Sequence, residues 1–211
     1  MQQPTPMTIK SMLHRLSGMK AENVFLCFAI FFGFLFVFLI PPFRSLDEQS
    51  HYLRVFQIKS GQLIGSHTKP VGAGGILPLN VGESTYDMLA ARKNGEVPTK
   101  YNHNKILKYA HDRPDASKKG QYIFPNTVLY SPVPYMGHLV GLFLADNILG
   151  AGLSPMVYMT RISGLLFWVF LMYWAIRTIP FGRWALMSIA LIPAALYEAS
   201  TINADAMTMA V

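Results

Sequence analysis

The sequence is short of cysteine and short of charge. Its one cysteine, Cys27, has no partner for an intrachain disulfide and says nothing about the redox compartment. Only 14% of the 211 residues are charged and 52% are apolar, whereas ordinary soluble domains have about 25% charged residues. This shortage excludes an ordinary soluble domain and predicts an integral membrane protein.

Acidic residues are the scarcer of the two signs, which leaves a net charge of +7. Such a balance could serve nucleic-acid binding, but the basic residues form no cluster on a polar helix face. They lie between apolar runs, as charges that flank membrane segments do. We therefore expect membrane lipids as partners and no nucleic acid.

The longest apolar run, residues 24–40, carries no charge and as a helix would span roughly 25 Å. It predicts the first transmembrane helix. Residues 1–23 are predicted as a cytoplasmic segment, because basic residues outnumber the one acidic residue there. A cleaved signal peptide is the alternative, but the polar leader is long and Pro-Pro-Phe-Arg-Ser offers no cleavage site. The expected location is the plasma (inner) membrane, with several passes.

A long extracytoplasmic loop, residues 41–154, is predicted to follow the first helix, which Pro41-Pro42 ends. We expect amphipathic and interfacial helices within it. The first, Asp47 to Ser60, has Ser45 as its cap, stops at Gly61 and would lie along the membrane surface.

The middle of this loop is rich in turn-forming residues. His67 to Asn80 is predicted to be a flexible linker, and Ser84 to Asn94 a second short helix closed by Gly95. Tyr101 to Gly120 is basic and irregular. It is either a solvated loop or a surface that attracts phosphate-bearing lipid headgroups.

Residues 133–149 are apolar but contain His138 and are interrupted by Asp146-Asn147, so two topologies remain open. If the segment spans the membrane, Arg177 and Arg183 lie outside. If it is interfacial or re-entrant, both arginines flank a cytoplasmic turn, and the positive-inside rule favours this arrangement.

The second topology predicts an all-α integral membrane fold with about three spanning helices. Ser154 would cap the second helix, Pro193 would kink the third, and the apolar end indicates that a further segment follows. The expected segments after the loop are transmembrane helix 2 at 155–178, a cytoplasmic turn at 179–183, transmembrane helix 3 at 184–202 and an external end at 203–211.

Two adjacent carboxylates, Asp47 and Glu48, follow the first helix at once. His51 and Arg54 share a helix face with Asp47. Because the carboxylates repel, one could have a raised pKa suited to a general base, or Mg or Mn could bridge the pair with His51 or Asp205. The plainer alternatives are carboxylates that complement a helix dipole and a supporting or surface histidine.

A second acidic pair, Glu198 and Asp205, lies at the outer end of the third helix in the favoured topology. Ionisable groups there are costly unless they line a wet cavity or form ion pairs. Glu198 is therefore either a functional residue or the ion-pair partner of Arg161 or Arg44. Asp205 is expected on the same side of the membrane as the first pair.

Short motifs follow one another from residue 40 onward: Pro41-Pro42, Asp47-Glu48 with His51, the run Tyr130-Ser131-Pro132-Val133-Pro134-Tyr135, Arg161, Pro193 and Asp205. In this order they resemble a bacterial predicted-membrane-protein family of unknown function. That family is itself similar to GT-C type glycosyltransferases, which use polyprenyl-phosphate sugars. The resemblance implies a GT-C-like fold, with Asp47 or Glu48 as the catalytic base or metal-associated carboxylate and Asp205 assisting.

One GT-C feature is missing, since Tyr130-Ser131 stands where a lysine would bind the lipid phosphate. Sugar transfer needs a base, charge stabilisation for phosphate and a site shielded from water. The expected partners are a lipid-linked sugar donor and a glycan or lipid acceptor. The alternative is a non-catalytic membrane component of polysaccharide assembly or export. The candidate substrate-binding residues are Arg44, His51, Arg54, Tyr130, Arg161, Glu198 and Asp205. Any one of the three arginines could face the phosphate.

Overall fold

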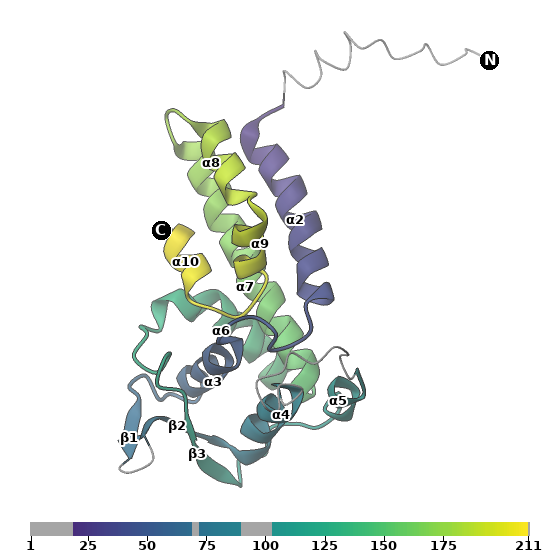
Figure 1. Ribbon diagram of the computed structural model, residues 1–211, viewed down its shortest axis with the longest axis vertical. Helices are drawn as coiled ribbons and strands as arrows, with labels where there is room; N and C mark the ends of the chain where they lie inside the picture. Colours follow the sequence, from purple (N-terminus) through teal and green to yellow (C-terminus); the bar gives the residue numbers. More distant parts are fainter. Residues whose placement is uncertain (1–18, 69–71, 90–102, 211) are drawn as a thin grey trace, which may run out of the picture.

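The computed structural model describes residues 19–68, 72–89 and 103–210. A bundle of helices forms one part of the molecule, and the segment between its two longest helices folds into a second part, called here the loop domain (Figure 1). Of the predicted cytoplasmic segment, residues 1–18 lie outside the described residues.

Two helices are long and apolar enough to cross a membrane, α2 (Ala21–Leu39) and α7 (Leu153–Thr178). They run side by side in the bundle (Figure 1). Gly33 allows close packing, since a Cβ there would lie 2.8 Å from the Leu165 side chain. The chain is therefore an α-rich membrane protein with two candidate spanning helices.

The third predicted spanning helix is two short helices, α8 (Arg183–Ala190) and α9 (Pro193–Ala199). The prediction of one kinked helix over 184–202 is corrected at this point. Ile192, which precedes the proline, has an extended ψ of 134°, so Pro193 starts a new helix rather than bending an old one. α8 begins after Gly182, which has a φ of +74°.

The segment 133–149 contains a 3₁₀ turn, η2 (Val133–Tyr135), helix α6 (Met136–Phe143) and a π-helical turn, η3 (Leu144–Ile148). The three turns form one continuous helical stretch, Val133–Ile148, which at 1.5 Å per residue is about 24 Å long and so shorter than a bilayer core of about 30 Å. α6 lies across the end of the bundle next to the loop domain (Figure 1). This geometry favours the interfacial placement over the spanning one.

The loop domain also contains α3 (Glu48–Lys59), α4 (Leu79–Leu89), α5 (His103–Lys108) and an antiparallel sheet in the order β1-β2-β3. The strands are β1 (Ser66–Thr68), β2 (Gly72–Pro78) and β3 (Lys119–Ile123). The prediction of an all-α fold is therefore wrong for this domain, and so is the prediction of a flexible linker over His67 to Asn80.

The glycines that suggested a linker serve close packing instead. A Cβ on Gly74 would lie 1.8 Å from the carbonyl oxygen of Tyr122 in β3, and one on Gly75 would meet the Gln57 side chain at 2.8 Å. Gly75 pairs with Tyr122 in the sheet register. These glycines let the strand approach both its neighbour and α3, so their spacing reflects sterics rather than flexibility.

Helix α3 is the central helix of the loop domain and does not lie along a surface as predicted. All eight residues from His51 to Ile58 are buried. Ser45 does not cap it. The residue before the helix is Asp47, which has a left-handed φ of +55° and makes no capping hydrogen bond with its side chain.

Other element boundaries also differ from the predicted ones. α4 begins at Leu79 rather than Ser84, and the predicted end at Asn94 lies outside the described residues. α5 occupies part of the basic stretch from Tyr101 to Gly120. Ser154 lies inside α7 and does not cap it, because its hydroxyl donates to the carbonyl of Ile106 at 2.6 Å.

Two apolar cores meet along α7. Its first residues, including Leu153 and Val157, pack in the loop domain with α3. Later residues, including Leu165 and Trp168, pack against α2 and α9 in the bundle. Arg161 lies between the two cores. Helix α7 therefore packs in both and joins the loop domain to the bundle.

Candidate functional site

A polar cavity of about 260 Å³ lies where the loop domain meets the end of the bundle. It brings together the start of α3, the segment before η2, and the chain between α9 and α10 (Asp205–Ala210). Nine residues line it: Leu46, Asp47, His51, Asn126, Thr127, Tyr130, Glu198, Asn203 and Asp205. Five of them are predicted site residues: Asp47, His51, Tyr130, Glu198 and Asp205. They include at least one residue of each acidic pair.

Asp47 reaches the cavity because the backbone turns sharply at this residue. Its left-handed φ of +55° is a conformation that aspartate adopts more readily than most residues other than glycine and asparagine. Its carbonyl accepts the amide hydrogens of Ser50 and His51 and so starts α3. The carboxylate itself is exposed, which leaves it open to a ligand.

Glu48 lies outside the cavity and is completely buried. Its carboxylate accepts hydrogen bonds from the amides of Phe43 at 2.8 Å and Ile202 at 3.1 Å. It also accepts two from the guanidinium of Arg161, each at 2.7 Å. These bonds occupy both buried carboxylate oxygens, two on each, so Glu48 has a structural role and its prediction as a catalytic carboxylate is corrected.

Arg161 completes this buried junction and does not face a substrate phosphate as predicted. Its guanidinium donates to the carbonyls of Val37 at 3.1 Å, Ile40 at 2.6 Å and Pro41 at 3.1 Å. These carbonyls lie at the end of α2, where no later helical amide can satisfy them. Its ion-pair partner is Glu48, so the predicted pairing of Arg161 with Glu198 is wrong.

His51 presents its ring to the cavity from the first turns of α3. Its Nδ1 is hydrogen-bonded with the Tyr135 hydroxyl at 2.7 Å, and its ring meets that of Tyr130 edge to face at 5.7 Å. Burial lowers the pKa of His51, although the Asp205 carboxylate opposes part of this shift. Among the described residues Nε2 has no hydrogen-bond partner, so the neutral ring can bond a ligand there.

Glu198 and Asn203 form the opposite wall. The Asn203 amide donates to the Glu198 carboxylate at 2.8 Å, to the Glu198 carbonyl at 2.6 Å and to the Thr201 hydroxyl at 3.0 Å. Its side-chain oxygen accepts the amide hydrogen of Ala206 at 3.0 Å. Asn203 therefore fixes the turn that carries both Glu198 and Asp205, and Asp205 stays exposed.

His138 contacts the backbone of this wall on the side away from the cavity. It is buried in α6, and its two ring nitrogens lie 3.1 Å from the carbonyl oxygens of Thr160 in α7 and Asn203. Gly164 makes room for the ring, since a Cβ there would lie 2.0 Å from its Cε1. His138 thus ties the wall of the cavity to α7.

The remaining predicted residues take different roles. Arg54 donates to Gln57 at 2.6 Å and to the carbonyls of Leu63 and Tyr130, each at 2.8 Å. These bonds connect α3 to the chain at Leu63 and at Tyr130. Arg54 does not line the cavity, so its predicted role in substrate binding is corrected. Arg44 is half-buried in the turn before α3. Tyr130, which was predicted to bind substrate, lines the cavity.

The predicted metal site is not assembled. Across the described residues no three histidine, cysteine, aspartate or glutamate side chains lie close enough to hold an ion. Glu48 points toward Arg161, away from Asp47 and His51, so these three residues do not fit a shared Mg or Mn ion.

Sequence reasoning missed Asn203, Thr127, Tyr135 and His138 as parts of the site. Asn203 lies two residues before the predicted Asp205, a proximity that could have singled it out. Thr127 lines the cavity and donates to the carbonyl of Ser50 at 2.9 Å, a contact across 77 residues that no local pattern reveals.

A helix bundle, a loop domain packed on its end and an acidic cavity between them define an α-rich membrane protein with a ligand-sized site. The chain matches the family described as predicted membrane protein (DUF2142) over residues 28–211 and belongs to that family, whose function is unknown. The comparisons with curated proteins and with solved structures found no match.

Proposed function

We propose that the protein is a membrane glycosyltransferase that moves a sugar from a polyprenyl-phosphate donor to a hydroxyl of a glycan or lipid acceptor. The observation that carries the proposal is the cavity that gathers Asp47, Glu198, Asp205 and His51 from distant parts of the chain. Exposed carboxylates in a polar cavity suit a reaction in which a hydroxyl must lose a proton.

In this proposal Asp47 is the general base. Its carboxylate is exposed in the cavity, whereas the Glu198 carboxylate accepts a hydrogen bond from Asn203. The further carboxylate oxygens of Glu198 and Asp205 accept hydrogen bonds from sugar hydroxyls. His51, neutral because burial lowers its pKa, accepts or donates one more at Nε2. Asp47 takes the acceptor proton as the acceptor oxygen bonds to C1 of the donor sugar, and the C1–O bond to phosphate breaks to release the polyprenyl phosphate.

An apolar groove next to the cavity suits the isoprenoid chain of the donor. It has a volume of about 550 Å³ and is lined by Ser131, Val133, Pro134, Met136, Phe167, Leu171, Met207 and Thr208. Two segments line both spaces: the chain from Tyr130 to Pro134 and the chain from Asp205 to Thr208. A donor could therefore lay its lipid in the groove and its sugar in the cavity.

The donor phosphate needs a positive partner, and the cavity lining is acidic. We propose Arg44 for this role because of its position: it is half-buried and lies three residues before Asp47 in the same turn.

Replacing Asp47 with asparagine should lower sugar transfer by about 10²- to 10⁴-fold, the usual contribution of a general base. Asp205→Asn should also lower transfer, because it removes an acceptor of sugar hydroxyl bonds. The measurement is the surface glycan of a deletion strain that carries each variant, with mass spectrometry of lipid-linked sugars. We expect these donors to accumulate while the variant protein still inserts into the membrane.

The matched control is Asp112→Asn, which removes an exposed carboxylate that does not line the cavity. It should leave the glycan unchanged. Normal glycan in both the Asp47 and the Asp205 variants would eliminate the enzyme and leave a non-catalytic component of polysaccharide assembly or export.

For this reaction we propose a plasma-membrane location, a cytoplasmic N-terminus and an outer position for the loop domain. In a Cys27→Ser background, a cysteine at Pro180, between α7 and α8, should stay unlabelled by an impermeant thiol reagent added to sealed cells. A cysteine at Lys118 in the loop domain should be labelled. The reverse pattern would place the cavity on the cytoplasmic side and contradict the proposal.

A further inference from the structure

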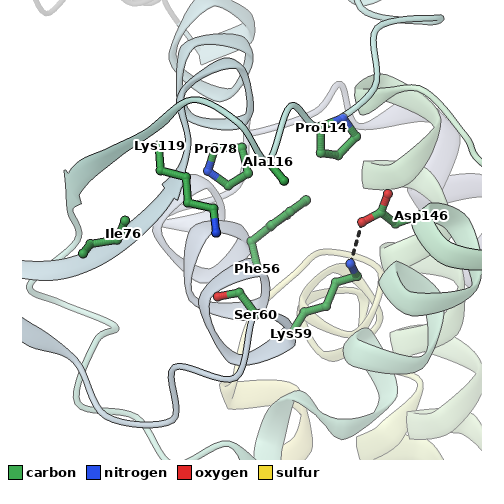
Figure 2. A pocket seen from close by; sticks show the side chains of 9 residues that line it. All are labelled: Phe56, Lys59, Ser60, Ile76, Pro78, Pro114, Ala116, Lys119 and Asp146. Atoms are coloured by element: carbon green, nitrogen blue, oxygen red, sulfur yellow. Dashed lines mark hydrogen bonds and ion pairs between the residues drawn. The ribbon is translucent and has the colours of Figure 1, made fainter.

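A second cavity of about 260 Å³ lies at the other end of α3, and it shares no lining residue with the first. Figure 2 shows it between the last turn of α3, strand β2, the segment leading into β3 and the turn η3. The lining residues are Phe56, Lys59, Ser60, Ile76, Pro78, Pro114, Ala116, Lys119 and Asp146. Apolar walls with a few convergent polar groups are the usual make-up of a ligand pocket.

One wall carries an ion pair that is mostly withdrawn from water. Lys59 Nζ lies 2.5 Å from Asp146 Oδ2, and the two side chains are 16% and 20% exposed (Figure 2). The lysine nitrogen is also 5.7 Å from the centre of the Phe56 ring. Lysine has two further N–H donors and the aspartate a second oxygen, so the pair can both donate to and accept from ligand hydroxyls.

Asp146 is presented by a π-helical turn. Such turns are rare in proteins and are frequent at functional sites, because the regular helical hydrogen bonds are given up there. The turn places the Asp146 carboxylate in the wall of the cavity, where it pairs with Lys59.

A second lysine, Lys119, stands at the opposite rim. It is the first residue of β3 and pairs with Pro78 in the sheet register. Among the described residues its ammonium has no carboxylate partner, and Figure 2 shows the side chain reaching over the cavity. Two lysines against one aspartate give the lining a net positive charge, so the cavity favours an anion.

The apolar part of the lining suits one face of a sugar ring. Phe56 forms the floor, and Pro78 and Pro114 stand on either side of it (Figure 2). The C–H bonds on the flat face of a pyranose pack against surfaces of this kind, while its hydroxyls need a donor and an acceptor side by side. The Lys59–Asp146 pair supplies both.

We propose that this cavity binds one residue of an acidic saccharide. The sugar ring lies against the apolar lining formed by Phe56, Pro78 and Pro114, its hydroxyls bond with Lys59 and Asp146, and its carboxylate pairs with Lys119. A carboxylate fits better than a phosphate, because the lining has a single unpaired ammonium and no arginine to meet three phosphate oxygens. The inference stands on this cavity alone and does not require the proposed transferase activity.

The test is binding of small sugars to the purified full-length chain in detergent, measured by calorimetry and by saturation-transfer NMR. Methyl glucuronide should bind about three- to tenfold more tightly than methyl glucoside, the range expected for one solvated charge-assisted contact. Glucose 6-phosphate should bind no more tightly than the glucuronide. Equal binding of glucuronide and glucoside, or tighter binding of the phosphate, would overturn the proposal.

Substitutions then locate the contacts. Lys119→Gln should abolish the preference for the glucuronide and leave binding of the glucoside as it was. Asp146→Asn should weaken both sugars, and a thermal unfolding curve checks that this variant still folds. Lys118→Gln removes a neighbouring exposed lysine that does not line the cavity, so it should change nothing. A glucuronide preference that survives Lys119→Gln would contradict the assignment.

A last variant separates this inference from the proposed function. Asp47→Asn alters the first cavity only, so glucuronide binding should be unchanged in it even where sugar transfer is lost. Loss of glucuronide binding in Asp47→Asn would show that the sugar occupies the first cavity and would refute the second site.

Discussion

Replacing Arg161 with methionine is expected to destabilise the protein by about 3–5 kcal/mol, the cost of removing one partner from a buried ion pair. Both side chains of the Arg161–Glu48 pair have 0% exposure. The substitution leaves the Glu48 carboxylate buried without its counter-charge. It also releases the carbonyls of Val37, Ile40 and Pro41 at the end of α2.

The free energy of unfolding in detergent, or the midpoint of thermal unfolding, measures this loss. Arg177→Met is the matched control, because Arg177 is exposed near the far end of the same helix. The double variant Arg161→Met with Glu48→Gln removes both charges and should be less destabilised than the sum of its parts. An unfolding midpoint that does not move in Arg161→Met would show that the pair contributes nothing to stability.

Replacing Gly164 with alanine is the second substitution expected to have a large effect. Its Cβ would lie 2.0 Å from Cε1 and 2.2 Å from Nδ1 of His138, so the ring or the helix must move. Overpacking of this kind costs about 1–3 kcal/mol. Displacing His138 also loosens its contact with the Asn203 carbonyl, which holds one wall of the candidate site.

A double variant distinguishes the clash from other effects. In a His138→Ala background the ring is absent, and Gly164→Ala should then be neutral or stabilising by up to about 1 kcal/mol, because alanine is the better helix former. Thermal unfolding of the four proteins completes the cycle. Equal destabilisation in both backgrounds would mean that the ring is not what Gly164 accommodates.

Long apolar runs were predictable from the sequence because their signal is local. The run 24–40 predicted a helix close to the observed α2, and the run 155–178 predicted most of α7. Pro193 marked a disturbance in the third run, yet local pattern could not tell a kink from a complete break. That difference depends on Ile192, which has an extended ψ of 134° and so ends α8 before Pro193 starts α9.

Failures in the loop domain have a common physical cause. Glycine is read locally as flexibility, but Gly74 and Gly75 are needed where a strand meets Tyr122 and Gln57, residues distant in sequence. Helix α3 has the pattern of a surface helix because it contains His51, Arg54 and other polar residues. His51 and Arg54 are each buried against a polar partner that the sequence does not identify.

The sequence by itself determined the class of protein and its long helices. Asp47 and Glu48 were equivalent at that level, since neighbouring carboxylates differ only in where the backbone sends them. The tertiary structure separated them. The left-handed turn at Asp47 leaves that carboxylate exposed in the cavity, while Glu48 turns inward to Arg161, 113 residues away. Burial and pairing depend on contacts across the chain, and only the folded protein sets these.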